Sequence, residues 1–166
     1  MHGLVGAKYS FGTHVVPGGM FRTVLVTIDG SDDSERALAL AIQIAQAFEG
    51  TLHIVTVTRT HVIATQLGGA IAPPTTDDIR SADELLRAAQ TQAKAKGVEL
   101  VITQVLEGPT IPDEILDYAA KIHPDILVTG ARGLTTGQRW LLGSVSDSLV
   151  RKAPCPILVA RPPPSS

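Results

Sequence analysis

The stretch TVLVTIDGSDDSERALALAIQIAQAFEG, residues 23–50, decides the fold. Its first six residues form a β-branched run typical of a buried strand, and the DGSDDS that follows supplies a turn and several candidate helix N-caps. From Ser34 onward the apolar residues recur at the spacing of one helical face, and Gly50 stands where a helix C-cap belongs. The stretch therefore predicts a strand that leads directly into a helix.

The same alternation of strands and helices continues to the end of the chain. Alternation of this kind favours a parallel sheet, because each right-handed crossover lays its helix on a face of the sheet. We expect an α/β fold, Rossmann-like, with a five-stranded parallel sheet in the order 3-2-1-4-5 and helices on both faces. The predicted strands are residues 23–28, 51–57, 98–106, 125–130 and 155–161, and the helices begin at Ser34, at Ser81 with a Ser81–Glu84 capping box, at Thr110 and at Ser144.

The sequence predicts one domain with an extension at its N-terminus and a short tail at its C-terminus. A length of 166 residues with 44% hydrophobic content fits a single core, which we place at residues 21–162. Residues 1–20 are expected to be a flexible N-terminal extension and residues 163–166 a C-terminal tail. The segment 59–80 is interrupted by Gly and Pro, and we predict a mobile surface loop there.

Composition excludes several classes of function. The net charge is −2 and only 4% of residues are aromatic, so neither a basic footprint nor a stacking surface for nucleic acid is present. No apolar run reaches the roughly 20 residues needed to span a bilayer. A single cysteine cannot form an intramolecular disulfide, and the five histidines lack metal-ligand spacing. We expect a cytoplasmic protein without a metal site, a membrane association or a nucleic-acid partner.

A glycine-rich stretch, VTGARGLTTGQRWLLGSVSDSL at residues 128–149, marks the candidate site. In the expected sheet order the first and fourth strands are neighbours, so Asp29 and Gly130 follow carboxyl ends that face one crevice. Gly143 and Ser144 open a helix whose first amides lack intrahelical partners, which favours an anion there. Two alternatives stay open on spacing alone. The glycines could serve only a turn, and Ser144 could cap its own helix in a capping box with Asp147.

The two best-known phosphate-binding patterns are absent. The chain contains no G-x-x-x-x-G-K-[ST], and no G-x-G-x-x-G follows the first strand. The spacing Gly130-x2-Gly133-x9-Gly143-Ser144 instead resembles the G-2x-G-9x-G-(S/T) motif of the ATP-binding branch of the universal stress protein family. The runs VLVTIDGSDDSERAL and APCPILVARP resemble the two ends of that family, and the similarity covers residues 22–162.

The resemblance implies an adenine nucleotide alpha hydrolase-like fold and a set of binding residues. Asp29 would contact the adenosine part, Thr27 the ribose, and the backbone of Val57 the adenine edge. Without the resemblance, Asp29 is better explained as a cap of the turn before the first helix, because Asp is common at such turns. The nucleotide-binding residues implied are Thr27, Ile28, Asp29 and Val57, then Gly130 beside ribose and phosphates, Arg132 toward phosphate charge, and Gly133, Gly143, Ser144, Val145 and Ser146 around the phosphates.

The resemblance also implies function and partners. The ligand would be ATP, with ADP and AMP as alternatives and with or without Mg²⁺. The family commonly forms homodimers through the last strand, here Ile157 to Ala160. No residue is assigned a catalytic role, so we expect a nucleotide-dependent stress-response regulator with at most slow ATP hydrolysis and an unidentified regulatory protein partner. An ATP hydrolase or phosphotransferase, and a nucleotide-free dimeric interaction module, are the alternatives.

Overall fold

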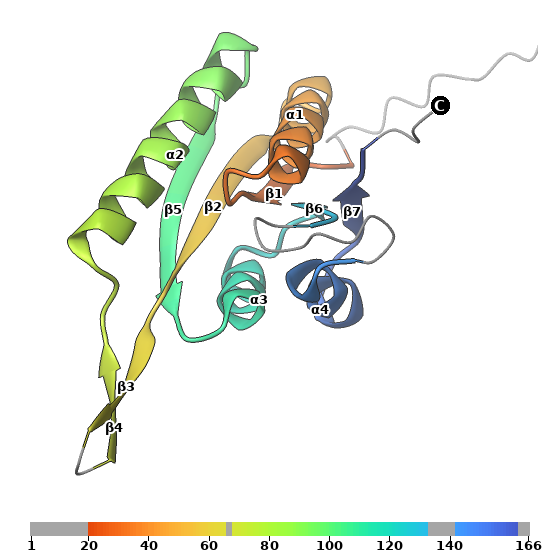
Figure 1. Ribbon diagram of the computed structural model, residues 1–166. Helices are drawn as coiled ribbons and strands as arrows, with labels where there is room; N and C mark the ends of the chain where they lie inside the picture. Colours follow the sequence, from red (N-terminus) through yellow and green to blue (C-terminus); the bar gives the residue numbers. More distant parts are fainter. Residues whose placement is uncertain (1–19, 66–67, 133–141, 163–166) are drawn as a thin grey trace, which may run out of the picture.

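The computed structural model describes residues 20–65, 68–132 and 142–162. Its centre is a five-stranded parallel sheet in the order β5-β2-β1-β6-β7 (Figure 1), which is 3-2-1-4-5 in the chain order of these strands. The predicted α/β fold and strand order are confirmed. The sheet strands are β1 (Thr23–Thr27), β2 (Thr51–Arg59), β5 (Val101–Gly108), β6 (Ile126–Gly130) and β7 (Ile157–Ala160). The helices are α1 (Asp32–Ala47), α2 (Thr76–Ala95), α3 (Ile111–Ile122) and α4 (Ser144–Lys152).

Helices cover both faces of the sheet, as predicted (Figure 1). On β1 the side chains alternate between the two faces, because successive strand residues point in opposite directions. Val24 and Val26 belong to the core cluster that includes residues of α1 and α2. Leu25 belongs to the second cluster, with residues of α3 and α4. Within the described ranges, no helix is long and apolar enough to cross a membrane.

The turn between β1 and α1 shows why the chain changes direction at the sheet edge. Gly30 has φ +81, a left-handed conformation that favours glycine. Ser31 is the N-cap of α1, and its hydroxyl accepts a hydrogen bond from the Ser34 N–H at 3.2 Å. Asp32, Asp33 and Glu35 then place negative charge in the first turn, where the helix dipole favours it. The strand-to-helix transition predicted from this stretch is therefore found.

The prediction of a mobile loop for segment 59–80 is wrong, because two strands lie within this segment. β2 runs on to Arg59, and the next residues form an antiparallel hairpin of β3 (His61–Thr65) and β4 (Gly68–Ala72) (Figure 1). The β-branched content of HVIAT favours a strand, and the glycines at 68 and 69 did not prevent pairing.

Helix α2 begins earlier than the sequence predicted. Its capping box is formed by Thr75 and Asp78, whereas Ser81–Glu84 had been expected to fill that role. The Asp78 N–H donates to Thr75 Oγ1 at 3.1 Å, and the Thr75 N–H donates to Asp78 Oδ2 at 3.0 Å. Two prolines at 73 and 74 precede the cap, so the helix starts at the first capping pair that follows them.

The carboxyl edge of the sheet is uneven, and this creates the space for a site. β1 pairs with β2 only as far as Thr27 opposite Val55, whereas β5 accompanies β2 to Arg59. The Ile28 N–H donates to the Val55 carbonyl at 2.9 Å, so the backbone polar groups of Val55 point toward β1. Those of Val57, two residues on, point in the same direction and past the last paired residue of β1.

Candidate functional site

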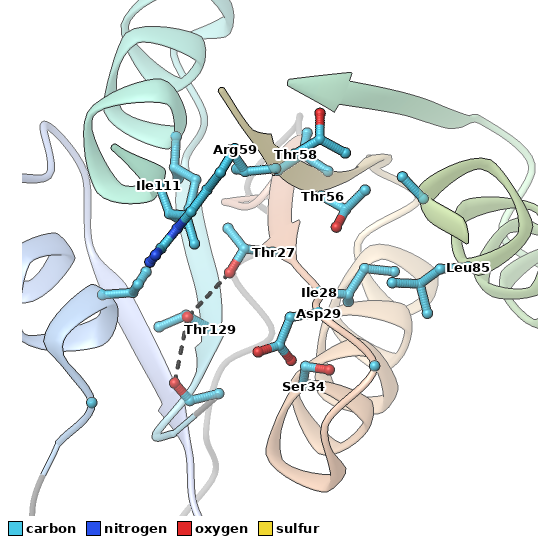
Figure 2. A pocket seen from close by; sticks show the side chains of 18 of the residues that line it. Thr27, Ile28, Asp29, Ser34, Thr56, Thr58, Arg59, Leu85, Ile111 and Thr129 are labelled. Atoms are coloured by element: carbon cyan, nitrogen blue, oxygen red, sulfur yellow. Dashed lines mark hydrogen bonds between the residues drawn. The ribbon is translucent and has the colours of Figure 1, made fainter. Parts of the chain in front are cut away.

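A cavity of about 680 Å³ lies at the uneven carboxyl edge of the sheet. Its wall joins the ends of β1, β2 and β6, one side of α2, and the first turns of α3 and α4 (Figure 2). Ligand sites in open parallel sheets are expected at this edge, outside the carboxyl ends of the strands. The volume falls within the usual range of small-molecule pockets.

The structure brings the sequence-predicted site residues together around this cavity. Those that line it are Thr27, Ile28, Asp29, Val57, Gly130, Arg132, Gly143, Ser144, Val145 and Ser146. Gly133 lies outside the described residues. Residues near position 28 and residues near position 145 thus share one wall, because β1 and β6 are neighbours in the sheet.

The cavity floor is a buried polar pair between the two central strands. Thr27 Oγ1 donates to Thr129 Oγ1 at 3.1 Å (Figure 2), and both residues are buried. Sequence reasoning had selected Thr27 but missed Thr129. The missed residue is the last but one of β6, opposite Val159 of β7. The Thr129 hydroxyl in turn donates to the Gly130 carbonyl at 3.4 Å, so both buried hydroxyls are hydrogen-bonded and the pair connects the ends of β1 and β6.

Gly130 is required by helix packing. A Cβ at this position would lie 2.8 Å from the Asp33 carbonyl carbon and 2.9 Å from the Ser34 nitrogen. Both are backbone atoms of the first turn of α1, and they could not move aside without shifting the helix. The absent side chain therefore allows α1 to begin directly against the end of β6, next to the cavity.

The described part of the fold gives no comparable reason for a glycine at position 143. It is the N-cap of α4, with φ −64 and ψ 156, a conformation open to any residue. Among the described residues, a Cβ here would meet nothing closer than 3.5 Å, an ordinary contact. The N-cap makes no side-chain hydrogen bond, so the first-turn amides of α4 are not capped from this position. The expected alternative of a Ser144–Asp147 capping box is wrong, since Ser144 is already inside the helix.

Ser146 holds the start of α4 onto the end of β6. Its buried hydroxyl donates to the carbonyl of Ala131 at 2.8 Å and to that of Gly143 at 3.0 Å. The Gly143 N–H also donates to the Ala131 carbonyl, at 2.8 Å. These contacts position the helix N-terminus at the cavity and engage the Ser146 hydroxyl in the fold itself.

Arg132 is held by a carboxylate that sequence reasoning missed. Its Nε donates to Oδ2 of Asp33 at 3.0 Å, and the other oxygen of Asp33 accepts from Arg36 at 2.8 Å. The Asp33 side chain is only 5% exposed, whereas that of Arg132 is 21% exposed. A buried carboxylate without a cation would be costly, so Asp33 and Arg132 stabilise each other. No local sequence signal joins two residues 99 positions apart.

Asp29 takes part in the turn and in the cavity wall at once. Its Oδ1 accepts a hydrogen bond from the Ser31 N–H at 3.0 Å, which is the turn-capping role that the sequence left open. The same residue lines the cavity, and Figure 2 shows it beside Ser34. The two roles are compatible, because a carboxylate can accept several hydrogen bonds.

Other lining residues come from segments that the sequence did not assign to the site. Thr56, Thr58 and Arg59 belong to the part of β2 beyond β1, and Leu85 and Ile111 come from α2 and α3 (Figure 2). The β-branched pattern of β2 continues through Thr58, and this continuation was the signal available to find them.

Titratable groups with shifted pKa values lie outside the cavity lining. Burial lowers the pKa of His53, whose Nδ1 is 3.0 Å from the Tyr118 hydroxyl under α3. Burial raises the pKa of the Cys155 thiol, which disfavours the reactive thiolate at neutral pH. Among the described residues, no group of three or more His, Cys, Asp or Glu side chains could hold a metal ion.

An open parallel sheet covered on both faces, with a cavity at its carboxyl edge, defines a Rossmann-like α/β protein. Residues 20–161 match the universal stress protein family. The chain belongs to this family.

Similarity to individual proteins extends over most of the chain. Universal stress protein YxiE of Bacillus subtilis is 33% identical over 150 residues, which cover 86% of this chain and 100% of that protein. Universal stress protein UspA from Lactobacillus plantarum shares the fold, with a TM-score of 0.72 at 23% identity over 85% of this chain and 99% of that one. A universal stress protein solved in complex with cAMP has a TM-score of 0.66 at 28% identity, covering 86% and 98%.

Proposed function

We propose that this protein binds an adenine nucleotide across the carboxyl edge of its sheet. The base would lie at the overhang of β2, residues 56–59 beyond the last residue paired with β1, and the phosphates at the start of α4. The observation that carries the proposal is the presence, in one cavity, of outward-facing backbone groups at Val57 and of a helix N-terminus at Gly143. ATP is the form that we propose, with ADP and AMP as the alternatives.

The base end of the proposed site is apolar with a polar edge. Val55, Leu85 and Ile111 line this region and suit the faces of a purine ring. The N–H and C=O of Val57 point past the end of β1, so they can pair with the acceptor and the donor on the edge of adenine. Recognition through the backbone is also the role that the family resemblance implied for Val57.

The phosphate end of the proposed site is the N-terminus of α4. Gly143 is a glycine although neither its conformation nor its neighbours require one, which leaves room for a close approach by phosphate oxygens. The amides of Ser144, Val145 and Ser146 would donate to those oxygens, and the helix dipole favours their negative charge. Mg²⁺ would enter with the phosphates of the ligand.

The relative solved with cAMP supports an adenine nucleotide as the ligand class. That protein is 28% identical to this chain, and the match covers 86% of this chain. Its ligand combines adenine with a phosphate, the two groups for which we propose separate parts of the cavity.

A regulatory role is favoured over rapid hydrolysis. The acidic residues that line the cavity are Asp29 and Asp78, and each accepts a capping hydrogen bond, from the Ser31 N–H and the Thr75 N–H respectively. A turn and a helix cap therefore account for both carboxylates without a catalytic role. We therefore propose a nucleotide-dependent regulator located in the cytoplasm, with a protein partner and at most slow ATP hydrolysis.

The test is calorimetric titration of nucleotide-stripped protein with ATP and Mg²⁺, beside Gly143→Val and Gly143→Ala variants. We expect the wild type to bind and Gly143→Val to lose at least about tenfold in affinity, because its branched side chain would enter the phosphate position. Gly143→Ala should fold equally well and bind with intermediate affinity, since a single Cβ has room there.

Three results would contradict the proposal. Absence of binding by the wild type would favour a nucleotide-free interaction module. Equal binding by all three proteins would place the phosphates elsewhere. A turnover of roughly 10 per second would instead indicate an ATP hydrolase or phosphotransferase.

We also propose a homodimer joined through β7. This strand pairs with β6 and ends the sheet on that side, and Ile157, Leu158 and Val159 are only half buried. An apolar edge strand is a natural template for pairing with a second copy.

A further inference from the structure

Arg59 is a cationic side chain in the cavity wall whose charge the fold does not use. It is the last residue of β2, it lines the cavity, and it is exposed. Within the described ranges, no hydrogen bond or ion pair holds its guanidinium. Arginine presents several fixed N–H donors that match the geometry of phosphate oxygens.

The fold directs Arg59 toward the same face of the sheet as α4. Val57 packs in the core cluster that includes Ile111 of α3 and Val145 of α4. Side chains two residues apart on a strand point to the same face, so Arg59 follows Val57 onto the α3 and α4 side. Figure 2 shows the Arg59 side chain extending from the end of β2 toward the part of the cavity where Ile111 and Thr129 lie.

Arg132, the second arginine that lines the cavity among the described residues, is already engaged. Arg132 donates from Nε to the buried Asp33 at 3.0 Å, which draws its guanidinium toward α1. The Asp33 carboxylate, which Arg36 also contacts, thus holds part of the Arg132 guanidinium. Of the two, Arg59 is the arginine whose whole guanidinium lacks a partner among the described residues.

We infer that Arg59 forms an ion pair with the phosphates of the ligand and makes the cavity prefer phosphorylated adenosine to adenosine itself. This inference rests on the proposed function and adds a specificity residue to it. The α4 amides would contact phosphate oxygens from one side, and Arg59 would approach from the end of β2. Sequence reasoning had given this electrostatic role to Arg132.

The test compares ATP, AMP and adenosine as ligands of the wild type and of Arg59→Gln, Arg59→Lys and Arg22→Gln variants. Arg22 is exposed and precedes β1, at the opposite edge of the sheet, so its substitution removes one positive charge far from the cavity. Affinities are measured by calorimetry at several salt concentrations, and circular dichroism confirms that each variant is folded.

We expect Arg59→Gln to weaken ATP binding by about tenfold, to weaken AMP binding less, and to leave adenosine binding unchanged. Arg59→Lys should recover part of the loss, Arg22→Gln should bind as the wild type, and the salt dependence of ATP binding should become shallower in Arg59→Gln.

Two results overturn the inference while leaving the proposed function intact. The first is an equal loss for ATP and adenosine in Arg59→Gln, which would mean that Arg59 packs against the base. The second is an unchanged preference for ATP. If the wild type binds none of the three ligands, the proposed function fails first and the inference fails with it.

Discussion

At the scale of single residues, the two described glycines of the motif serve different purposes. Gly130 allows the backbone of α1 to begin within about 3 Å of where its Cβ would stand. Gly143 has an ordinary extended conformation, and a Cβ there would meet its described neighbours at no less than 3.5 Å. A substitution at Gly130 therefore acts on the fold first, whereas a substitution at Gly143 acts on whatever occupies the cavity.

Asp33 shows how one buried carboxylate organises charge beside a binding cavity. It accepts from Arg36 within its own helix and from Arg132 at the end of β6. The ion pair between Asp33 and Arg132 holds the start of α1 against the end of β6. Gly130 allows the same close contact because it has no side chain. Packing and charge therefore reinforce each other at one point of the cavity wall.

His53 should make stability depend on pH. Burial lowers its pKa in the folded protein, so the unfolded chain binds the proton more readily. The stabilising contribution is thus present above the ordinary pKa of about 6.5 and is lost as the pH falls toward the lower folded-state value. We predict a lower urea midpoint at pH 5.5 than at pH 7.5.

A His53→Gln variant is the control for this prediction. Glutamine can still hydrogen-bond the Tyr118 hydroxyl but does not titrate. Its urea midpoint should change less between the two pH values than that of the wild type. The same pH dependence in both proteins would assign the effect to other groups.

At the scale of secondary-structure elements, the overhang of β2 is the feature that makes a polar edge available. We predict that Val57→Pro keeps the fold but weakens ATP binding by at least about tenfold. The proline removes an N–H that points past the end of β1, where no sheet bond depends on it, and sheets tolerate proline at such positions. Calorimetry measures the binding and urea denaturation the stability.

Thr58→Pro is the matched control. The Leu52 and Thr60 N–H groups donate to carbonyls on the β5 side, so by alternation the Thr58 N–H also points to β5. Its loss should cost about 2 kcal/mol of unfolding free energy, because a ladder bond is broken. Equal destabilisation by the two prolines would refute the backbone orientation described for Val57.

The elements of the sheet could be predicted because their signals are local. β-branched runs, turn residues and helical spacing occur within about ten residues, and they located the sheet strands and the four helices. The hairpin of β3 and β4 was missed because glycines 68 and 69 read as loop residues, whereas pairing with residues 61–65 compensated for their low strand propensity.

At the scale of the whole molecule, the free edge of β7 predicts the oligomeric state. The carbonyls of Pro156 and Ala160 accept hydrogen bonds from the β6 side, so by alternation the N–H of Val159 points away from the sheet. We predict a dimer in sedimentation equilibrium and a shift to monomer in Val159→Pro, which removes a donor from that edge.

A proline at the opposite edge serves as the comparison for Val159→Pro. β5 is the other edge strand, and the Leu100 and Gly108 carbonyls accept from the β2 side, so the N–H of Thr103 points outward by the same alternation. Thr103→Pro should leave the dimer intact. A monomeric wild type, or a dimer lost equally in both variants, would argue against pairing through β7.

The location of the site was predictable at this scale, but its internal contacts were not. Strand order alone brings the end of β1 beside the end of β6, which placed Asp29 and Gly130 in one crevice. The bond between Thr27 and Thr129, the pairing of Asp33 with Arg132, and the place of Arg59 all depend on packing between distant segments. One sequence carries no local signal for such contacts.

The cavity wall joins residues 27–30, 34 and 55–59 from the first half of the chain to residues 129, 130, 132 and 143–146 from the second. A nucleotide bound there would act as a non-covalent cross-link between the two halves, and neither half could open without releasing it. At a ligand concentration of 100 times Kd, the native state would gain about 2.7 kcal/mol. If proteolysis requires that opening, the lifetime of the protein in the cell would follow the nucleotide supply.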